Sequence, residues 1–467
     1  MRVRVLPALR RLSLSSLAIV AVSVSVVRAQ EAPITLQQAV TQATDRYPSV
    51  RAAAAQVSAA SANAALARDA YLPRADLLWQ INRSTRNNIS GLLFPQGVLS
   101  PISGPVSPES ADAIWNHAAG MLVAWEPLDF GYRSGMVRAA DAIRQAAGAE
   151  ESLTKLQVGT AAADAYLTVL AADEAVRAAT AGVARARVIF EVVNARAQAG
   201  LRPGAEAARA QAEVAAAESA KARAEQGAAV ARAELGRWLG VAPDRIAIAA
   251  GPFLRLPPEA GAGANALHPR LQAAAARVEG ARATEAAAAK TWVPRLFLEA
   301  TTYARGSGAA ANGAIGGSDI NGLALTTRNW AVGLNVTFPL FDAPVLRQRH
   351  ALEIAREQEA SARYDQAVQD LSADLAKAQV VLATAQRIAA LAPAQLDAAR
   401  AAEEQARARY DSGLGNIADV ADTQRLLTEA EISNGLAMLS VWRAQLGLAA
   451  ARGDLSPVLT LSAPGGR

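Results

Sequence analysis

The sequence contains no cysteine. That absence excludes disulfide bonds, cysteine-ligated zinc, iron–sulfur clusters, a thiol nucleophile and a cysteine-linked lipid anchor. The histidines are only three and are scattered, at His117, His268 and His350. No G-x-S-x-G motif or phosphate loop occurs, and Gly413-Leu414-Gly415 lacks the third glycine of a dinucleotide fingerprint. The sequence therefore predicts no catalytic residue, no metal site, no cofactor and no enzyme.

An excess of one charge sign is also missing from most of the chain. There are 47 basic and 42 acidic residues, for a formal net charge of +5. Five arginines before position 30, where no acidic residue occurs, account for that whole excess: Arg2, Arg4, Arg10, Arg11 and Arg28. The remainder is neutral, which disfavours nucleic acid as a partner.

Aromatic residues make up only 4% of the chain, although 52% of its residues are apolar. Alanine supplies much of that apolar fraction, and alanine fills little volume. A large globular core is therefore unexpected. Long, closely packed helices suit this composition better.

The first residues resemble a secretory signal peptide, which we place at residues 1–29. A basic start precedes an apolar run from Leu12 to Val27, and a small residue, Ala29, follows it. The alternative is an N-terminal membrane helix, but the run is short for a span of about 20 residues. No later stretch contains 18 consecutive apolar residues. An exported chain of this kind is either soluble in the periplasm or an outer-membrane β-barrel.

The remaining chain contains an internal repeat, recognised by matching short motifs in the same order. Residues 47–55 match residues 268–276, Pro73-Arg74 matches Pro294-Arg295, Pro127-Leu128 matches Pro339-Leu340, and Gly200-Leu201 matches Gly413-Leu414. Each half reads as helix, strand, loop, strand, very long helix, turn and helix. We expect a first repeat at 30–240, a linker rich in Pro and Gly at 241–267, a second repeat at 268–450 and a tail at 451–467.

Four segments alternate between apolar and polar residues and are predicted as strands, at about 74–83, 118–126, 295–304 and 330–339. In the last, Trp330, Val332 and Leu334 alternate with smaller or polar residues. A soluble sheet with one buried face gives the same pattern. The long polar loops at 87–116 and 306–329 favour strands that cross an outer membrane. The aromatic residues near the ends of these runs are expected at the lipid interface: Trp79, Trp125, Tyr303 and Trp330.

Four strands cannot close a barrel. An open sheet edge in hydrocarbon would leave backbone N–H and C=O groups without partners. A membrane location therefore requires several copies of the chain. Two copies give eight strands and a lumen filled by side chains, whereas three give a twelve-stranded conduit, so we expect a homotrimer.

The predicted helices are too long for a compact globular domain. No proline interrupts the helical pattern from Gly131 to Ala199, a span on the order of 100 Å. Apolar residues in both halves follow heptad spacing, at Leu153, Leu156, Thr160, Ala163, Leu167 and Leu170 and at Val368, Leu371, Leu375, Ala378, Leu382 and Ala385. A periplasmic coiled-coil scaffold or adaptor would explain the helices but not the paired strands.

With these features together, the chain resembles the TolC-type family of outer-membrane efflux proteins over about residues 34–450. The motifs that carry the resemblance are the opening Ile34-Thr35-Leu36, the junctions Pro127-Leu128-Asp129-Phe130-Gly131 and Pro339-Leu340-Phe341-Asp342, and the turn from Ala408 to Val420. The resemblance implies a mixed α and β membrane protein. A trimeric twelve-stranded barrel in the outer membrane continues into a long α-helical barrel in the periplasm. The implied partners are outer-membrane lipid, a periplasmic adaptor protein and an inner-membrane transporter.

The second hairpin turn contains the residues of greatest functional interest. Asp419 and Asp422 share one face of a helix start, so three copies would place up to six carboxylates around one opening. Such a ring attracts cations, although an acid in a first helical turn also simply favours the helix dipole.

By resemblance, these two acids match the family's periplasmic aperture, and Tyr410 and Glu206 match residues that hold neighbouring hairpins together. An arginine that follows the turn in other members is Gly415 here, so we expect fewer charged links. The resemblance also implies that an adaptor docks at the hairpin tips, Gly200, Leu201, Gly413 and Leu414, where glycine is also the ordinary helix-ending residue.

The sequence thus predicts a passive outer-membrane duct that is opened by an adaptor and an inner-membrane pump. A type I protein-secretion duct has the same architecture and stays an alternative, as does a periplasmic scaffold without a pore. A wide lumen discriminates poorly between cargoes, so the cargo could be a drug, a metal ion, a siderophore or a protein.

Overall fold

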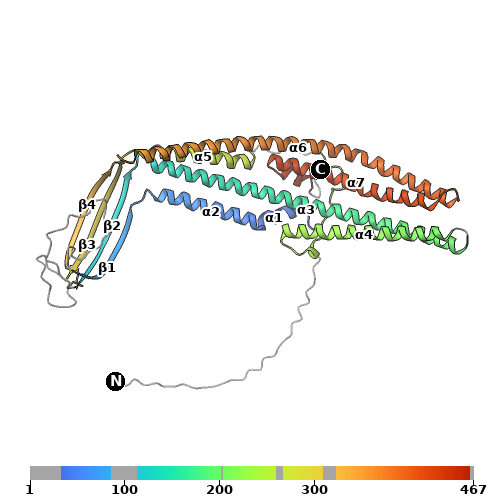
Figure 1. Cartoon of the computed structure of the whole chain (residues 1–467), viewed down its shortest axis with the longest axis horizontal. Helices are drawn as coiled ribbons and strands as arrows, with labels where there is room; N and C mark the ends of the chain where they lie inside the picture. The colour runs from blue at the N-terminus through green and yellow to red at the C-terminus, as the bar shows by residue number, and fades with distance from the viewer. Residues whose placement is uncertain (1–32, 86–112, 201–202, 259–266, 309–321, 463–467) are drawn as a thin grey trace, which may run out of the picture.

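The computed structural model describes residues 33–85, 113–200, 203–258, 267–308 and 322–462. The molecule is elongated, with a small β-sheet at one end and long helices that extend away from it (Figure 1). The predicted signal peptide at residues 1–29 lies outside the described residues. Within the described residues, no helix combines the length and the apolarity needed to span a bilayer.

The helices follow the predicted order. An order of helix, two strands, a very long helix and a shorter helix occurs twice along the chain. The two very long helices, α3 and α6, contain 67 and 69 residues. The bounds are α1 Leu36–Arg46, α2 Pro48–Asp69, α3 Tyr132–Gln198, α4 Gly204–Leu239, the 3-10 turn η1 Pro243–Arg245, α5 Pro269–Ala288, α6 Ala343–Asp411, α7 Ile417–Arg452 and α8 Ser456–Leu461.

The four strands form one antiparallel sheet in the order β1-β2-β3-β4, with β1 Arg74–Thr85, β2 Ala113–Leu128, β3 Arg295–Ser307 and β4 Thr327–Thr337. Each overlaps a strand predicted from alternation. β2 begins at Ala113, inside the segment expected as a loop, because it pairs with β1 up to Thr85. β4 ends at Thr337, ahead of Pro339, since proline has no N–H to donate to a neighbouring strand. Among the described residues, β1 and β4 each have one edge without a partner strand.

The helix α3 lies at the centre of the helical part and packs against α2, α4, α5 and α7. Its buried face near the sheet consists of alanines, and small side chains allow neighbouring helix axes to come close. At Gly135 the approach to α5 is so close that an added Cβ would lie 2.7 Å from the Cβ of Ala287. Among the described residues α6 packs only against α5 and α7, and Val368 of its predicted seam is 40% exposed.

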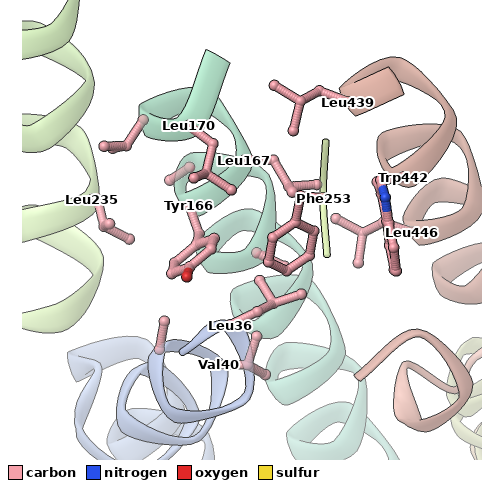
Figure 2. Packing of buried hydrophobic residues seen from close by; sticks show 14 of the residues in the cluster. Leu36, Val40, Tyr166, Leu167, Leu170, Leu235, Phe253, Leu439, Trp442 and Leu446 are labelled. Atoms are coloured by element: carbon pink, nitrogen blue, oxygen red, sulfur yellow. The ribbon is translucent and has the colours of Figure 1, made fainter. Parts of the chain in front are cut away.

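A compact aromatic core lies where the two halves meet, and the linker supplies its central residue. Figure 2 shows Phe253 between Tyr166 of α3 and Trp442 of α7, with ring centroids 5.8 Å and 5.0 Å away. The Tyr166 hydroxyl donates to the Ala249 carbonyl at 2.6 Å, and burial raises the pKa of Tyr166 to about 12. The Trp442 indole donates to the Arg255 carbonyl at 3.0 Å. The linker is therefore bound between the halves rather than merely connecting them.

The sheet is joined to the helices through Arg133 at the start of α3. Its Nε donates to Asp129 Oδ2 at 2.8 Å, its Nη1 donates to the Ala70 carbonyl at 2.7 Å, and it also donates to the Glu126 carbonyl. Burial opposes ionisation of Asp129, but hydrogen bonds from Arg133 and from the Gly131 backbone hold the pKa of Asp129 below its usual value. One buried cation thus connects the end of α2, the end of β2 and the start of α3.

The second half begins with a histidine cap. His268 Nδ1 accepts the N–H of Arg270 at 3.1 Å, and Nε2 lies 3.3 Å from the Ala450 carbonyl. These contacts require a neutral ring with its proton on Nε2. Burial lowers the pKa of His268 below its usual value of 6.5, and the nearby Arg270 acts in the same direction.

We expect Phe253→Ala to destabilise the protein by about 3–5 kcal/mol, because it leaves a cavity between two buried aromatic rings. Thermal loss of the helical circular dichroism signal at one fixed scan rate measures the effect. Leu256→Ala is the matched control, since that side chain lies in the same linker but is 53% exposed. Equal shifts for the two variants would contradict the central role of Phe253.

Because the folded-state pKa of His268 is lowered, neutral His268 contributes stability above about pH 6.5 that is lost as the pH falls through the lowered value. We expect acidification from about pH 7.5 to about pH 5 to lower the melting temperature more in the wild type than in His268→Asn, because asparagine caps a helix without titrating. Parallel pH dependences in the two proteins would rule out this role.

Candidate functional site

The turn between α6 and α7 is shaped by its glycines. Gly413 adopts φ 79°, a left-handed conformation that favours glycine at the end of a helix. The N–H groups of Leu414 and Gly415 both donate to the Arg409 carbonyl, at 2.8 Å and 3.0 Å. Asn416 then caps α7 by accepting the N–H of Asp419 at 2.9 Å. The sequence Ser-Gly-Leu-Gly-Asn therefore produces a tight reversal of two long helices.

Both hairpin tips end in a left-handed glycine, and one presents an apolar side chain. Gly200 adopts φ 71°, and Leu414 is 76% exposed beside Gly413. Leu201, which is also part of the predicted docking tips, lies outside the described residues. The second tip thus displays a large apolar residue to solvent at the end of the molecule farthest from the sheet (Figure 1).

The two candidate aperture acids occupy the first two turns of α7. Asp419 and Asp422 are both exposed, and their spacing puts them on one face. Arg425 forms an ion pair with Asp422 across a single turn. Asp419, by contrast, forms no ion pair with another of the described residues. The i, i+3 spacing of Asp422 and Arg425 was visible in the sequence but was not used in the prediction.

Tyr410 and Glu206, which the sequence analysis singled out, lie in contact within one chain. The hydroxyl of Tyr410, at the end of α6, donates to Glu206 Oε2, at the start of α4, at 3.3 Å. Tyr410 is only 4% exposed and packs in a small apolar cluster with Val193, Ala210, Ile417 and Val420. This contact joins the α3/α4 hairpin to the α6/α7 hairpin within one chain.

A second link between the hairpins was missed by the sequence analysis. Arg196, near the end of α3, lies over the Tyr410 ring at 5.5 Å and pairs with Asp411 at 3.2 Å. An arginine in the last turn of a helix is common, so its position gave no distinctive signal. The contacts that hold the described parts of the tips therefore include a hydrogen bond to a carboxylate, an ion pair and a cation–π contact.

Farther from the tips, Arg185 of α3 locks the two hairpins together. It forms hydrogen bonds with Glu431 at 2.9 Å and 3.2 Å and with the Thr428 hydroxyl at 2.9 Å. Both charged side chains are 23% exposed. These partners are far apart in the sequence, so no local pattern identified the pair. The contact holds α3 against α7 above the candidate aperture.

The sheet has one apolar and one polar face. The apolar face contains Leu77, Trp79, Trp125, Trp330 and Leu334, which the pairing register places on the same side. Leu77 and Trp330 are 85% and 79% exposed. The opposite, polar face contains Asp76, Gln80, Glu299 and Asn335. Large apolar side chains thus face away from the chain itself.

The register corrects one expectation about the interfacial aromatics. Tyr303 pairs with Gly120 and Asn329, and its side chain lies on the polar face, opposite Trp79 and Trp330. The run 295–304 places residue 303 in phase with Glu299, because side chains alternate along a strand. Gly120 accommodates the tyrosine, since an added Cβ would lie 2.4 Å from the Cβ of Tyr303.

The described residues contain no group of three or more His, Asp or Glu side chains arranged to hold a metal ion. Their ionisable side chains instead form pairs and short links within and between helices, as at Arg185 and Arg196.

Comparison with known proteins identifies relatives over nearly the whole chain. The family model described as "Outer membrane efflux protein" matches residues 39–241 and 263–454. The pyoverdine export outer membrane protein OpmQ of Pseudomonas aeruginosa is 27% identical over 409 residues, covering 86% of this chain and 81% of the relative. Protein CyaE of Bordetella pertussis is 29% identical over 444 residues, covering 90% and 84%.

Solved structures share the fold. The outer-membrane channel OprN matches with a TM-score of 0.70 and 21% identity, covering 90% of this chain and 89% of the other. The outer membrane protein VceC of Vibrio cholerae matches with a TM-score of 0.71 and 20% identity, covering 90% and 96%. At these identities the matches establish a common fold.

We expect Tyr410→Phe to loosen the hairpin tips, because it removes a hydrogen bond worth about 1 kcal/mol. Hydrogen exchange should become about five-fold faster in peptides that cover the end of α6 and the start of α4. Tyr364→Phe, at a half-buried position on the same helix, is the matched control. Unchanged exchange at the tips of the Tyr410→Phe protein would contradict a closing role for this contact.

Proposed function

This chain belongs to the outer membrane efflux protein family, and on that premise we propose that three copies of it form a passive export duct. As a family member the chain is an outer-membrane efflux or export channel component and not an enzyme. Its helical part lies in the periplasm. Family membership favours this function over a periplasmic scaffold without a pore.

The homotrimer is inferred from the edges of the sheet. In hydrocarbon, the unpaired backbone groups on β1 and β4 would each cost several kcal/mol, and pairing with neighbouring copies removes that cost. Two copies would close eight strands around a lumen filled by side chains. Three copies close twelve strands, enough for a conduit. The observation that carries the proposal is this open four-stranded sheet with a strongly exposed apolar face.

The helical part supports the same association. On α6, Val380, Val381 and Leu391 are 66%, 56% and 70% exposed, and among the described residues α6 packs only against α5 and α7. An apolar helix face of this kind is unusual for a monomer. A neighbouring copy would cover it and continue the barrel of strands as a barrel of helices.

The tryptophans of the apolar face also support a placement of the sheet in the membrane. Trp125 lies toward the helices, and its indole donates to the Tyr71 carbonyl at 2.9 Å. Trp79 pairs with Ala119, which is about 20 Å from Trp125 along β2. We assign Trp125 to the inner aromatic girdle and Trp79 with Trp330 to the outer one, because tryptophan favours the interfaces of a membrane.

The internal duplication is supported by the twice-repeated element order and by the two separate matches of the family model, at 39–241 and 263–454. The halves meet at the linker that carries Phe253. A duplicated unit supplies two strands and one long hairpin per half, so three chains give six similar units around one axis.

The aperture lies at the hairpin tips. Asp419 and Asp422 of each copy face the opening, and the Tyr410–Glu206 contact holds neighbouring hairpins together. The tips at Gly200, Leu201, Gly413 and Leu414 dock a periplasmic adaptor, and an inner-membrane transporter supplies the energy. A named relative exports pyoverdine, and siderophore-like molecules are therefore a first cargo to test on this chain.

Purified protein in detergent should have the mass of three subunits and form ion channels in planar bilayers. Light scattering and single-channel recording measure these properties. A stable single subunit, or a trimer without any conductance, would overturn the proposed duct.

We expect Asp419→Asn with Asp422→Asn to raise single-channel conductance and to weaken block by multivalent cations, because up to six carboxylates around one opening are neutralised. Asp397→Asn is the control, since this exposed acid lies on α6 well away from the turn. If the variant matched the wild type in cation selectivity and in block by multivalent cations, the placement of both acids at the aperture would be wrong.

A further inference from the structure

A shallow groove crosses the apolar face of the sheet near the end that is distant from the helices. Its volume is about 480 Å³, and the residues that border it on this face include Leu77, Trp79, Met121 and Arg328. Ala119 and Ala304 form its floor. The groove therefore has an aromatic wall on one side and a cationic wall on the other.

The groove arises from a single row of paired residues. Trp79 pairs with Ala119, Ala119 with Ala304, and Ala304 with Arg328, so two small side chains separate two large ones across the four strands. Trp79 is 70% exposed, and its ring contacts the His117 ring edge-on with centroids 5.9 Å apart. That contact holds the indole upright beside the alanine floor.

The outer end of this face is cationic. Arg83 lies on the same face as Trp79, with its guanidinium 5.7 Å from the Trp115 ring centroid. Neither Arg83 nor Arg328 forms an ion pair with a carboxylate of the described residues. In the described parts of the strands beyond the Trp79 row, no aspartate or glutamate occurs.

Two exposed arginines on a lipid-facing surface need an explanation. Arginine in hydrocarbon is destabilising, but near the interface the cost falls to about 0–1 kcal/mol. Position beside the outer tryptophans puts Arg328 at the depth of the lipid headgroups. At that depth an anionic group is the natural counter-charge, and guanidinium binds phosphate oxygens in a bidentate manner.

We propose that this groove binds a phosphorylated glycolipid of the outer leaflet. Arg328 and Arg83 pair with its phosphate groups, and an acyl chain lies over Ala119 and Ala304 between the Trp79 ring and the Arg328 stem. The inference rests on the proposed membrane placement of the sheet. It adds a specific lipid to a surface that the duct function requires only to be apolar.

The test uses the full assembly in detergent, stripped of lipid and titrated with deep-rough lipopolysaccharide, whose lipid A has two phosphates. Native mass spectrometry measures the affinity. We expect Arg328→Gln to weaken binding about five-fold, and Arg83→Gln to have a similar effect, because a basic residue near an anionic lipid surface contributes about that factor. Ala304→Leu should also weaken binding, since it fills the floor without changing charge.

Arg305→Gln is the matched control, because Arg305 lies at the same end of the sheet but on the polar face. It should bind the glycolipid as the wild type does. Enzymatically dephosphorylated lipopolysaccharide and phosphatidylethanolamine should both bind the wild type more weakly. Equal losses for Arg305→Gln and Arg328→Gln, or equal affinity for phosphorylated and dephosphorylated lipid, would overturn the proposal.

Single-channel conductance of the same preparations separates this inference from the duct itself. Arg328→Gln is expected to conduct like the wild type, because the residue faces away from the lumen. If the wild type conducts and Arg328→Gln binds the lipid as tightly as it does, the proposed lipid site is wrong but the duct is not. If the wild type neither binds the lipid nor forms a channel, the membrane placement of the sheet is wrong, and the duct and the lipid site are wrong with it.

Discussion

The outer strands β1 and β4 each have an edge whose backbone hydrogen-bonding groups find no partner strand in the described chain. A hydrogen-bonding group that lacks a partner is tolerable in water and costly in lipid. The same sheet exposes Leu77 and Trp330 on one face, which is tolerable in lipid and unfavourable in water. The proposed trimer meets both requirements, because its copies join edge to edge within a membrane. The proposed barrel, the helical tube below it and the duct all depend on that closure.

The sheet and the helices are joined by a few polar contacts, in a chain whose helices otherwise pack largely through alanine. Arg133 satisfies two backbone carbonyls and Asp129 at the point where β2 turns into α3. At the other end of the molecule, Arg185 and Arg196 bind the two hairpins to each other. Alanine faces let the helices lie close but specify little about register, since small apolar side chains offer few distinctive shapes. The arginine contacts supply the register that alanine does not.

Periodicity was enough to locate the strands and the long helices, because alternation and the absence of proline are local properties. The family resemblance singled out Tyr410 and Glu206, and the structure shows the hydroxyl of Tyr410 3.3 Å from Glu206 Oε2. The partnership of Arg196 with Asp411 was not predictable, because the two residues belong to different hairpins and neither has a distinctive sequence neighbourhood. Phe253 was likewise hidden in a linker that reads as irregular, although its ring lies between Tyr166 and Trp442.

The sequence by itself determined the element order, the approximate strand positions and the chemical character of each strand face, since these follow from the spacing of residue types along the chain. Only the tertiary structure decided which distant residues share a face or a contact. Trp79 and Arg328 flank one groove because three successive strand pairings align them. Register is set by the whole sheet at once, and no single strand contains the information that fixes it.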